Sequence, residues 1–327
     1  MSTRTTRPAS GRTRTWPLPD LRNGTTVHLV TDQHEGFRFF TPDRHARMGA
    51  DLDLLKASAH AHVDAGDTIH WQTDDGTGVD PEDPTVNAWF AARATAEPGV
   101  PWVRVPGNHD LSSHTTPYPK RDATAWAAAA GQASPLTVTD AGDVRILGIG
   151  PDRWDYDQAG ATFGTCLLSP ATLAWLEAQL TAAGTRPVWI ANHAPLWEQY
   201  AADTTPADFT AGAEWWTSPR DQLAQIIDAH PNVVGWLSGH VHANVDTRPA
   251  FARSMTVGAR RIFAVNGPAS GGRIEGVDFD HQQYDSPTQS LYVTYLGDAI
   301  DVRCRDHQAG QWHALAGQQV RHVLLTG

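Results

Sequence analysis

Five short motifs rich in Asp, His and Asn follow one another along the chain. They are Asp32-Gln33-His34, Gly66-Asp67, Gly107-Asn108-His109-Asp110, Asn192-His193 and Gly239-His240-Val241-His242. Carboxylate, imidazole and amide groups are ligands that first-row divalent metal ions accept, and the set contains no thiolate. Together the motifs supply enough ligands for two ions. The sequence therefore predicts a site for two divalent metal ions.

Apolar stretches lead into four of the five motifs. They cover residues 27–30, 102–105, 188–190 and 233–237, and each is typical of a buried strand. Ligands at the ends of several strands meet at one edge of a sheet, where loops open to substrate while strands hold the geometry. Asp32 with His34, and His240 with His242, are two residues apart. That spacing places both side chains on one face of an extended strand.

Helical patterns separate these strands. One runs over residues 48–59, a second helix begins after Ser169-Pro170, and a third begins after Ser218-Pro219. The alternation of strand and helix predicts a largely parallel sheet. Beyond residue 250 the pattern changes to strands at 261–265, 290–295 and 299–303. We expect the last two to form a hairpin in a second sheet.

Composition narrows the class of protein. The 327 residues are 40% hydrophobic, which suffices for a large core, and no internal linker divides residues 21–327, so we expect a single domain there. Arginines stand among Thr, Ser, Pro and Gly in residues 1–20, which we interpret as a flexible basic tail. No apolar run suits a secretory signal or a membrane span, which favours a cytoplasmic protein. A net charge of −11 disfavours a nucleic-acid partner.

The order of the motifs resembles that of the calcineurin-like metallophosphoesterases, whose pattern is D-x-H, G-D, G-N-H-D/E, a single His and G-H-x-H. All five blocks are present, over residues 32–242. The resemblance implies an α/β fold, a four-layer αββα sandwich of two mixed sheets flanked by helices. It also implies a binuclear metal-dependent phosphoesterase in which a water between the ions is the nucleophile. The ligand types leave Mn, Fe, Zn, Co and Ni open.

The family pattern assigns roles to individual residues. It places one ion on Asp32, His34, Asp67 and His242, and the other on Asp67, Asn108, His193 and His240, so that Asp67 bridges them. His109 resembles the family's histidine that faces the scissile phosphate without binding metal, and we expect it to be the general acid. The family's protein Ser/Thr phosphatases carry an Asp where this chain has His70. His70 is therefore a candidate to contact substrate or to orient His109, and the alternative is a hydrogen-bonded loop histidine.

The substrate is less constrained by the sequence. The loops after the ligands contain aromatic residues such as Trp197, which could stack on a nucleobase at roughly 1–3 kcal/mol per base or cap the core. Small family members with these motifs are often phosphodiesterases, which favours a phosphodiesterase acting on a small phosphorylated molecule such as a nucleotide. A phosphate monoester carries more charge and would favour added cations, for which Arg104, Lys120 and Arg121 are the candidates.

Three alternatives stay open at this point. The first is a phosphomonoesterase that acts on a small metabolite. The second is a non-catalytic metal-binding scaffold, although scaffolds of this fold usually lack a ligand or the catalytic histidine, and this chain has all of them. The third is a nuclease of the repair type, which the acidic charge disfavours. The oligomeric state does not follow from the sequence.

Overall fold

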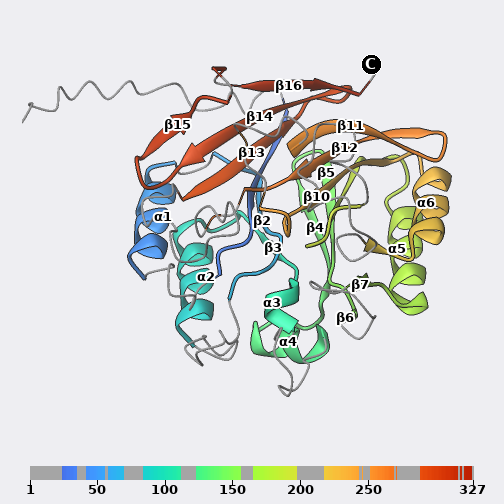
Figure 1. Cartoon of the computed structure of the whole chain (residues 1–327), viewed down its shortest axis with the longest axis horizontal. Coiled ribbons are helices and arrows are strands. Elements are labelled where there is room, and N and C mark those ends of the chain that lie inside the picture. The colour runs from blue at the N-terminus through green and yellow to red at the C-terminus, as the bar shows by residue number, and fades with distance from the viewer. Residues whose placement is uncertain are drawn as a thin grey trace, which may run out of the picture.

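The computed structural model describes residues 24–34, 42–55, 58–69, 84–111, 123–155, 165–196, 217–242, 245, 251–268, 270, 288–315, 317–318 and 320–325. The tail predicted at residues 1–20 lies outside these ranges. Within them the chain forms two large sheets that pack face to face, with helices on both outer sides (Figure 1). This architecture is the four-layer αββα sandwich that the resemblance of the motifs implied.

Seven described strands form the first sheet. Six follow the order β15-β14-β13-β1-β2-β3, and β16 pairs with β14. Their bounds are β1 Thr25–Val30, β2 Ala61–Asp64, β3 Trp102–Arg104, β13 Gln289–Tyr295, β14 Ala299–Asp306, β15 Gln311–His313 and β16 Arg321–Leu324. Strands β1, β2 and β3 run parallel, whereas β13 runs antiparallel to β1.

The hairpin predicted at residues 290–303 belongs to this sheet, so its assignment to a sheet apart from the first motif strands was wrong. β13 and β14 pair antiparallel, as expected, but β13 also pairs with β1, for example through Val27 and Val293. Leu291 and Val293 are buried in the same core as Val27 and Leu29. Extending the sheet beside β1 is what buries the apolar face of the hairpin.

The second sheet has six strands in the described residues, in the order β11-β12-β10-β8-β5-β4. Their bounds are β4 Leu136–Ala141, β5 Val144–Ile149, β8 Val188–Ala191, β10 Val233–Ser238, β11 Ala252–Val257 and β12 Arg260–Asn266. The four central strands are parallel, and β4 and β11 are antiparallel edges. A small third sheet, which the sequence did not predict, joins β6 Arg153–Asp155, β7 Thr165–Leu167 and β9 Thr217–Ser218.

Helices cover the outer faces of both large sheets. Their bounds are α1 Pro42–Leu54, α2 Pro84–Ala96, α3 Asn108–Leu111, α4 Ala123–Ala129, α5 Pro170–Ala182 and α6 Arg220–Ala229. α1 and α2 lie beside the first sheet, and α5 and α6 lie beside the second (Figure 1). Ser169 caps α5, because its side chain accepts a hydrogen bond from Thr172 N at 3.2 Å. Leu176 of α5 and Leu223 of α6 bury themselves against that sheet.

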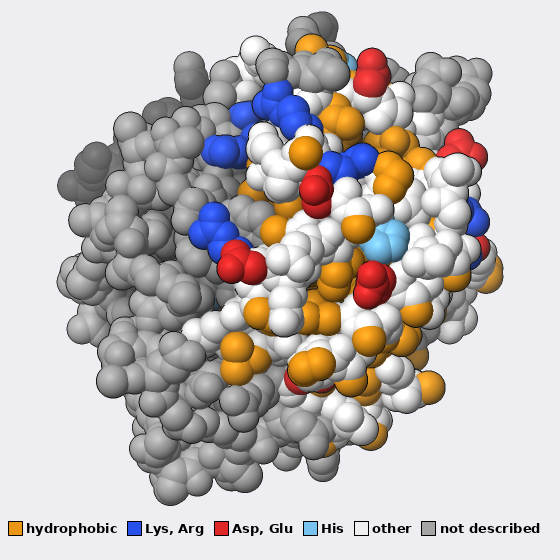
Figure 2. Space-filling model, turned by 90° about the vertical axis from the view of Figure 1, so that its right-hand side faces the viewer, with side chains coloured by type: hydrophobic (Ala, Val, Ile, Leu, Met, Phe, Trp, Pro, Cys, Tyr) orange, Lys and Arg blue, Asp and Glu red, His pale blue; other side chains and the backbone are white. Residues whose placement is uncertain are grey.

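The face that α5 and α6 present to solvent mixes charged and hydrophobic side chains (Figure 2). No helix in the described part of the chain combines the length and apolar character that crossing a membrane requires.

A chain of buried polar groups crosses the outer face of the first sheet. His28 Nδ1 lies 2.8 Å from His62 Nδ1, and His28 Nε2 lies 2.8 Å from Ser290 Oγ. Ser290 Oγ lies 2.7 Å from His307 Nε2, and His307 Nδ1 lies 2.8 Å from Asp51 Oδ2. Ser290 is fully buried, so this Ser-His-Asp arrangement links strands to α1 and does not present a nucleophile to substrate.

We expect the metal-free protein to lose stability as the pH falls from about 6.5 to 5. Burial, followed by the charges of His62 and His307, keeps the pKa of His28 well below its usual value, and burial also lowers the pKa of His307. Below about pH 6.5 the unfolded chain therefore binds more protons than the folded one, and the free energy of unfolding decreases. Two such histidines contribute up to about 2.7 kcal/mol per pH unit to this slope, and Asp110, whose pKa is raised to about 7, contributes with the opposite sign.

Urea unfolding of the metal-free protein at several pH values between about 6.5 and 5 measures this slope. His28→Asn should reduce it, because one of the two buried rings is gone. His322→Gln is the control, since His322 is exposed on β16, and it should leave the slope unchanged. A slope in His28→Asn equal to that of the wild-type protein would refute the expectation.

Candidate metal centre

The five motifs stand at the carboxyl ends of parallel strands. Asp32 follows β1, Asp67 follows β2 and Asn108 follows β3 in the first sheet, while His193 follows β8 and His240 follows β10 in the second. Both sheets thus bring candidate ligands to one edge of the sandwich, where the sequence predicted that strand ends would meet. The first and last motifs touch directly, because the backbone N–H of His240 donates to both carboxylate oxygens of Asp32, at 3.0 and 3.2 Å.

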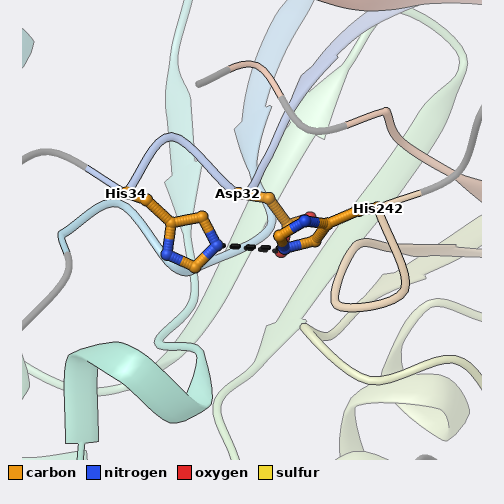
Figure 3. A group of neighbouring side chains, drawn as sticks. All are labelled: Asp32, His34 and His242. Atoms are coloured by element: carbon orange, nitrogen blue, oxygen red, sulfur yellow. Dashed lines mark hydrogen bonds and ion pairs between the residues drawn. The ribbon is translucent and has the colours of Figure 1, made fainter. Parts of the chain in front are cut away.

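Asp32, His34 and His242 form one group whose ligand atoms lie within 4.8 Å of one another. His34 Nε2 is 3.0 Å from His242 Nε2, and His242 Nε2 is 3.2 Å from Asp32 Oδ1. The two imidazole rings turn toward each other, with the carboxylate of Asp32 beside His242 (Figure 3).

Asp67, His193 and His240 form a second group within the same limit of 4.8 Å. His193 Nε2 lies 3.1 Å from Asp67 Oδ2 and 3.1 Å from Asn108 Oδ1. The Nδ1 of His193 donates to the carbonyl of Ala65 at 2.7 Å, since a carbonyl can only accept. That hydrogen bond fixes the ring so that Nε2 faces the group.

Asp67 lies between the two groups. Its Oδ2 is 3.1 Å from His193 Nε2 and 3.8 Å from His34 Nε2. Ligands bound at 2.0–2.3 Å from one ion stand about 3 Å apart, so the short distances in both groups fit first-row divalent ions. His34, Asp67 and His109 also form a group of close ligand atoms, which places His109 beside the same centre.

The backbone at the ligands is unusual. In the described residues, the non-glycine residues with positive φ are all predicted ligands: Asp32 (52°), His34 (48°), Asp67 (53°), His240 (73°) and His242 (46°). The left-handed region is unfavourable for such residues, by on the order of 1 kcal/mol each, and is retained mostly at functional sites. The idea that an extended strand aligns Asp32 with His34 and His240 with His242 was wrong, because all four residues lie after the strands and have left-handed backbone conformations.

Two motif glycines allow the loops to approach closely. A Cβ atom on Gly107 would collide with the carboxylate of Asp67, and one on Gly239 would collide with Thr31 and Asp32. Any side chain at either position would push a candidate ligand out of place.

The sequence matches the family model of the calcineurin-like phosphoesterases over residues 25–244. This range is more than half of the 327 residues and includes all five motifs. The chain belongs to this family. It is accordingly a metal-dependent phosphoesterase, whose candidate ligand groups are those described above. No curated protein matches the sequence.

Three solved structures align with this calcineurin-like chain. A dimetal phosphatase from Danio rerio aligns with a TM-score of 0.57 at 14% identity, over 93% of this chain and 100% of that one. A conserved uncharacterized protein from Streptococcus pneumoniae, a predicted phosphoesterase, gives 0.37 at 10% identity, over 91% of this chain and 97% of that one. Vacuolar Protein Sorting 29 from Cryptosporidium parvum gives 0.37 at 12%, over 91% and 96%. At 14% identity the first likeness shows a shared fold.

Neighbouring charges outweigh burial in setting the pKa values of Asp32 and His193 in the calcineurin-like centre. Burial by itself would raise the pKa of Asp32, but His242, followed by His193 and His34, holds that pKa below its usual range. Burial lowers the pKa of His193, whereas Asp67 and then Asp32 raise it to about 9. In the metal-free protein His193 is therefore an imidazolium at neutral pH, and a bound ion must displace its proton.

The Gly-Asn-His-Asp motif spans the start of α3. Asp110 Oδ2 accepts hydrogen bonds from Gly107 N and Asp67 N, both at 2.8 Å, and Oδ1 accepts from Ile69 N at 3.1 Å. Burial, followed by the charge of Asp67, raises the pKa of Asp110 to about 7. Asp110 thus fastens the loops of Asp67 and Asn108 together, and its side chain is fully buried. The backbone N–H of His109 donates to Asp67 Oδ1 at 2.8 Å, and its side chain is only partly buried.

Three sequence candidates for substrate contact have different outcomes. His70 and Trp197 lie outside the described residues. Arg104, a candidate phosphate clamp, is buried, and its Nε lies 3.6 Å from Asp64 Oδ2, so this prediction was wrong. Asp64 itself was missed. The sequence signal that could have identified Asp64 is its place between Val63 and Ala65 in an apolar strand. A charged side chain in such a place needs a buried partner of opposite charge.

Proposed function

We propose that the protein is a phosphodiesterase that uses two divalent metal ions to hydrolyse a small phosphorylated molecule. Seven side chains from five strand ends would hold the ions: Asp32, His34, Asp67, Asn108, His193, His240 and His242. The position of Asp67 between the two ligand groups is the observation that supports a two-ion centre most strongly. Oδ2 of Asp67 faces both groups, whereas Oδ1 accepts the backbone N–H of His109, so this one carboxylate would serve both ions.

The chemistry divides between the ions and the chain. When bound, two divalent ions supply Lewis acidity and lower the pKa of a bound water. His109 would provide the proton for the leaving oxygen, since its ring is partly exposed and lies edge-on to His34 with 4.8 Å between ring centres. Asp67 keeps His109 in place through the backbone N–H.

The charges around the centre favour a diester over a monoester. The buried carboxylates of Asp32 and Asp67 add negative charge at this edge, and the cation of Arg104 is turned to Asp64. A diester carries less negative charge than a monoester, so it needs fewer protein cations. Lys120 and Arg121, the other candidate cations for a monoester, lie outside the described residues. A phosphomonoesterase is therefore the alternative against which the proposal is tested.

The remaining features of the proposal come from the sequence. We propose a nucleotide as the substrate, because aromatic residues follow the ligand motifs. We also propose a single domain over residues 21–327 in the cytoplasm, without a nucleic-acid partner, on the basis of composition and charge.

Hydrolysis of bis(p-nitrophenyl) phosphate beside p-nitrophenyl phosphate tests the proposed reaction. The protein is first loaded with Mn²⁺, and the metal content is determined on the same sample. We expect kcat/KM for the diester to exceed that for the monoester by about tenfold or more, a difference of about 1.4 kcal/mol in transition-state binding. Preference for the monoester would replace the proposal with a phosphomonoesterase. Two bound ions without turnover of either ester would indicate the scaffold instead.

A further inference from the structure

A second set of buried charges lies behind the metal centre, on the face of the first sheet that α2 covers. Asp64 ends β2 and Arg104 ends β3, and the two residues are direct partners in the parallel register of these strands. Arg104 Nε lies 3.6 Å from Asp64 Oδ2, and both side chains are buried. An Arg and an Asp taken out of water together are stable only if they compensate each other.

Packing holds the guanidinium of Arg104 in one place. Its central carbon lies 3.7 Å from the centre of the Phe90 ring of α2, a distance at which a cation is attracted to the face of the ring. Its Nη1 donates to Asn87 Oδ1 at 3.4 Å and to the carbonyl of Ala130 at 3.3 Å. Arg104 therefore points to α2 and α4 and away from the ligand groups.

Asp64 and Asp110 connect this cation to the ligand loops. Asp64 accepts hydrogen bonds from Thr68 Oγ1 at 2.6 Å and from Gly66 N at 3.3 Å, the residues on either side of Asp67. Asp110 accepts from the backbone N–H of Asp67, as described above. Arg104, Asp110 and Thr68 line one cavity of about 10 Å³, room for about one water molecule. The charge of Arg104 also opposes the effect of burial on the pKa of Asp64.

We propose that Arg104 is a positioning residue of the metal centre. Its buried charge offsets Asp64 and Asp110, whose hydrogen bonds hold the loops of Asp67 and Asn108 in the conformation that ligates metal. Only the use of the centre in hydrolysis rests on the proposed function. The inference itself concerns how tightly the centre binds metal. Arg104 touches neither the ions nor the substrate.

Replacing Arg104 tests this role through metal binding. In Arg104→Met two buried carboxylates lose their cation, and we expect the affinity of the folded protein for Mn²⁺, measured by isothermal titration, to fall by about 10- to 100-fold. Arg104→Lys keeps the charge and should retain more of the affinity. Arg104→Met combined with Asp64→Asn removes one of the uncompensated carboxylates, so the double variant should bind Mn²⁺ more tightly than Arg104→Met alone.

Arg305→Met is the matched control, because it also breaks a buried Arg–Asp pair. Arg305 Nε donates to Asp51 Oδ2 at 2.7 Å, and the pair joins β14 to α1 away from the five motifs. We expect this variant to lower the melting temperature while the folded protein keeps its Mn²⁺ affinity. A loss of affinity as large as that of Arg104→Met would show that stability alone, and not positioning, controls metal binding.

Wild-type affinity for both ions in Arg104→Met would overturn the inference. Failure of the proposed function has a different signature, in which the wild-type protein binds two ions and hydrolyses neither nitrophenyl ester. In that case the affinity difference between Arg104→Met and Arg305→Met would still establish the positioning role.

Discussion

Asp67→Asn should remove two-ion occupancy and activity together. Asp67 Oδ2 faces His193 at 3.1 Å and His34 at 3.8 Å, so one carboxylate serves both ligand groups, and a neutral amide is a weak substitute for it. We expect turnover of bis(p-nitrophenyl) phosphate to fall by about 10³-fold, comparable to removal of a principal charge-stabilising group in other enzymes. Metal analysis after gel filtration should find fewer than two ions bound per chain.

Asp140→Asn provides the control for this variant. Asp140 is an exposed carboxylate of β4 that pairs with Arg145 at 2.8 Å, and pairs of this kind contribute little to stability. Its replacement should leave metal content and turnover unchanged. Two tightly held ions in Asp67→Asn would eliminate the bridging role.

His109→Ala should slow hydrolysis while both ions stay bound. A general acid contributes about 10²- to 10⁴-fold to the rate, and the partly exposed ring of His109 stands beside His34 and Asp67. The loss should be largest for alkyl esters, whose leaving oxygen needs a proton. It should be much smaller for nitrophenyl esters, because nitrophenolate leaves without one.

The same variant separates two roles for His109. The ring belongs to a group of close ligand atoms with His34 and Asp67, so it could also bind an ion. Loss of one ion in His109→Ala would assign it as a ligand and contradict the acid role. His322→Ala, at an exposed histidine of β16, should change neither metal content nor leaving-group dependence.

The sequence predicted the elements that carry the ligands because each has a strong local signal. The apolar run Val27–Val30 became β1, and Val233–Leu237 became most of β10. Ser169-Pro170 marked the start of α5 correctly, through a capping side chain that needs no tertiary partner. Motif order then predicted which residues converge.

Features that depend on distant partners were not predictable in this way. Leu291 and Val293 of β13 are buried in the core that also contains Val27 and Leu29 of β1. This tertiary packing decides which sheet β13 joins. The left-handed backbone at Asp32 and His240 follows from contacts between the first and last motifs, 208 residues apart. In the sequence Arg104 has the position of a free cation near a metal-ligand motif. It is buried because Asp64 lies beside it on β2 and Phe90 of α2 covers it, and both partners are distant in the sequence.

The most direct test of the two-ion centre is a titration of the metal-free protein with Mn²⁺, in which bound metal and turnover of bis(p-nitrophenyl) phosphate are measured at every step. The geometry around Asp67 predicts that activity rises until about two ions are bound per chain and then stays constant. Full activity at one ion per chain, or activity that persists after exhaustive chelation, would contradict a centre in which Asp67 joins two ions.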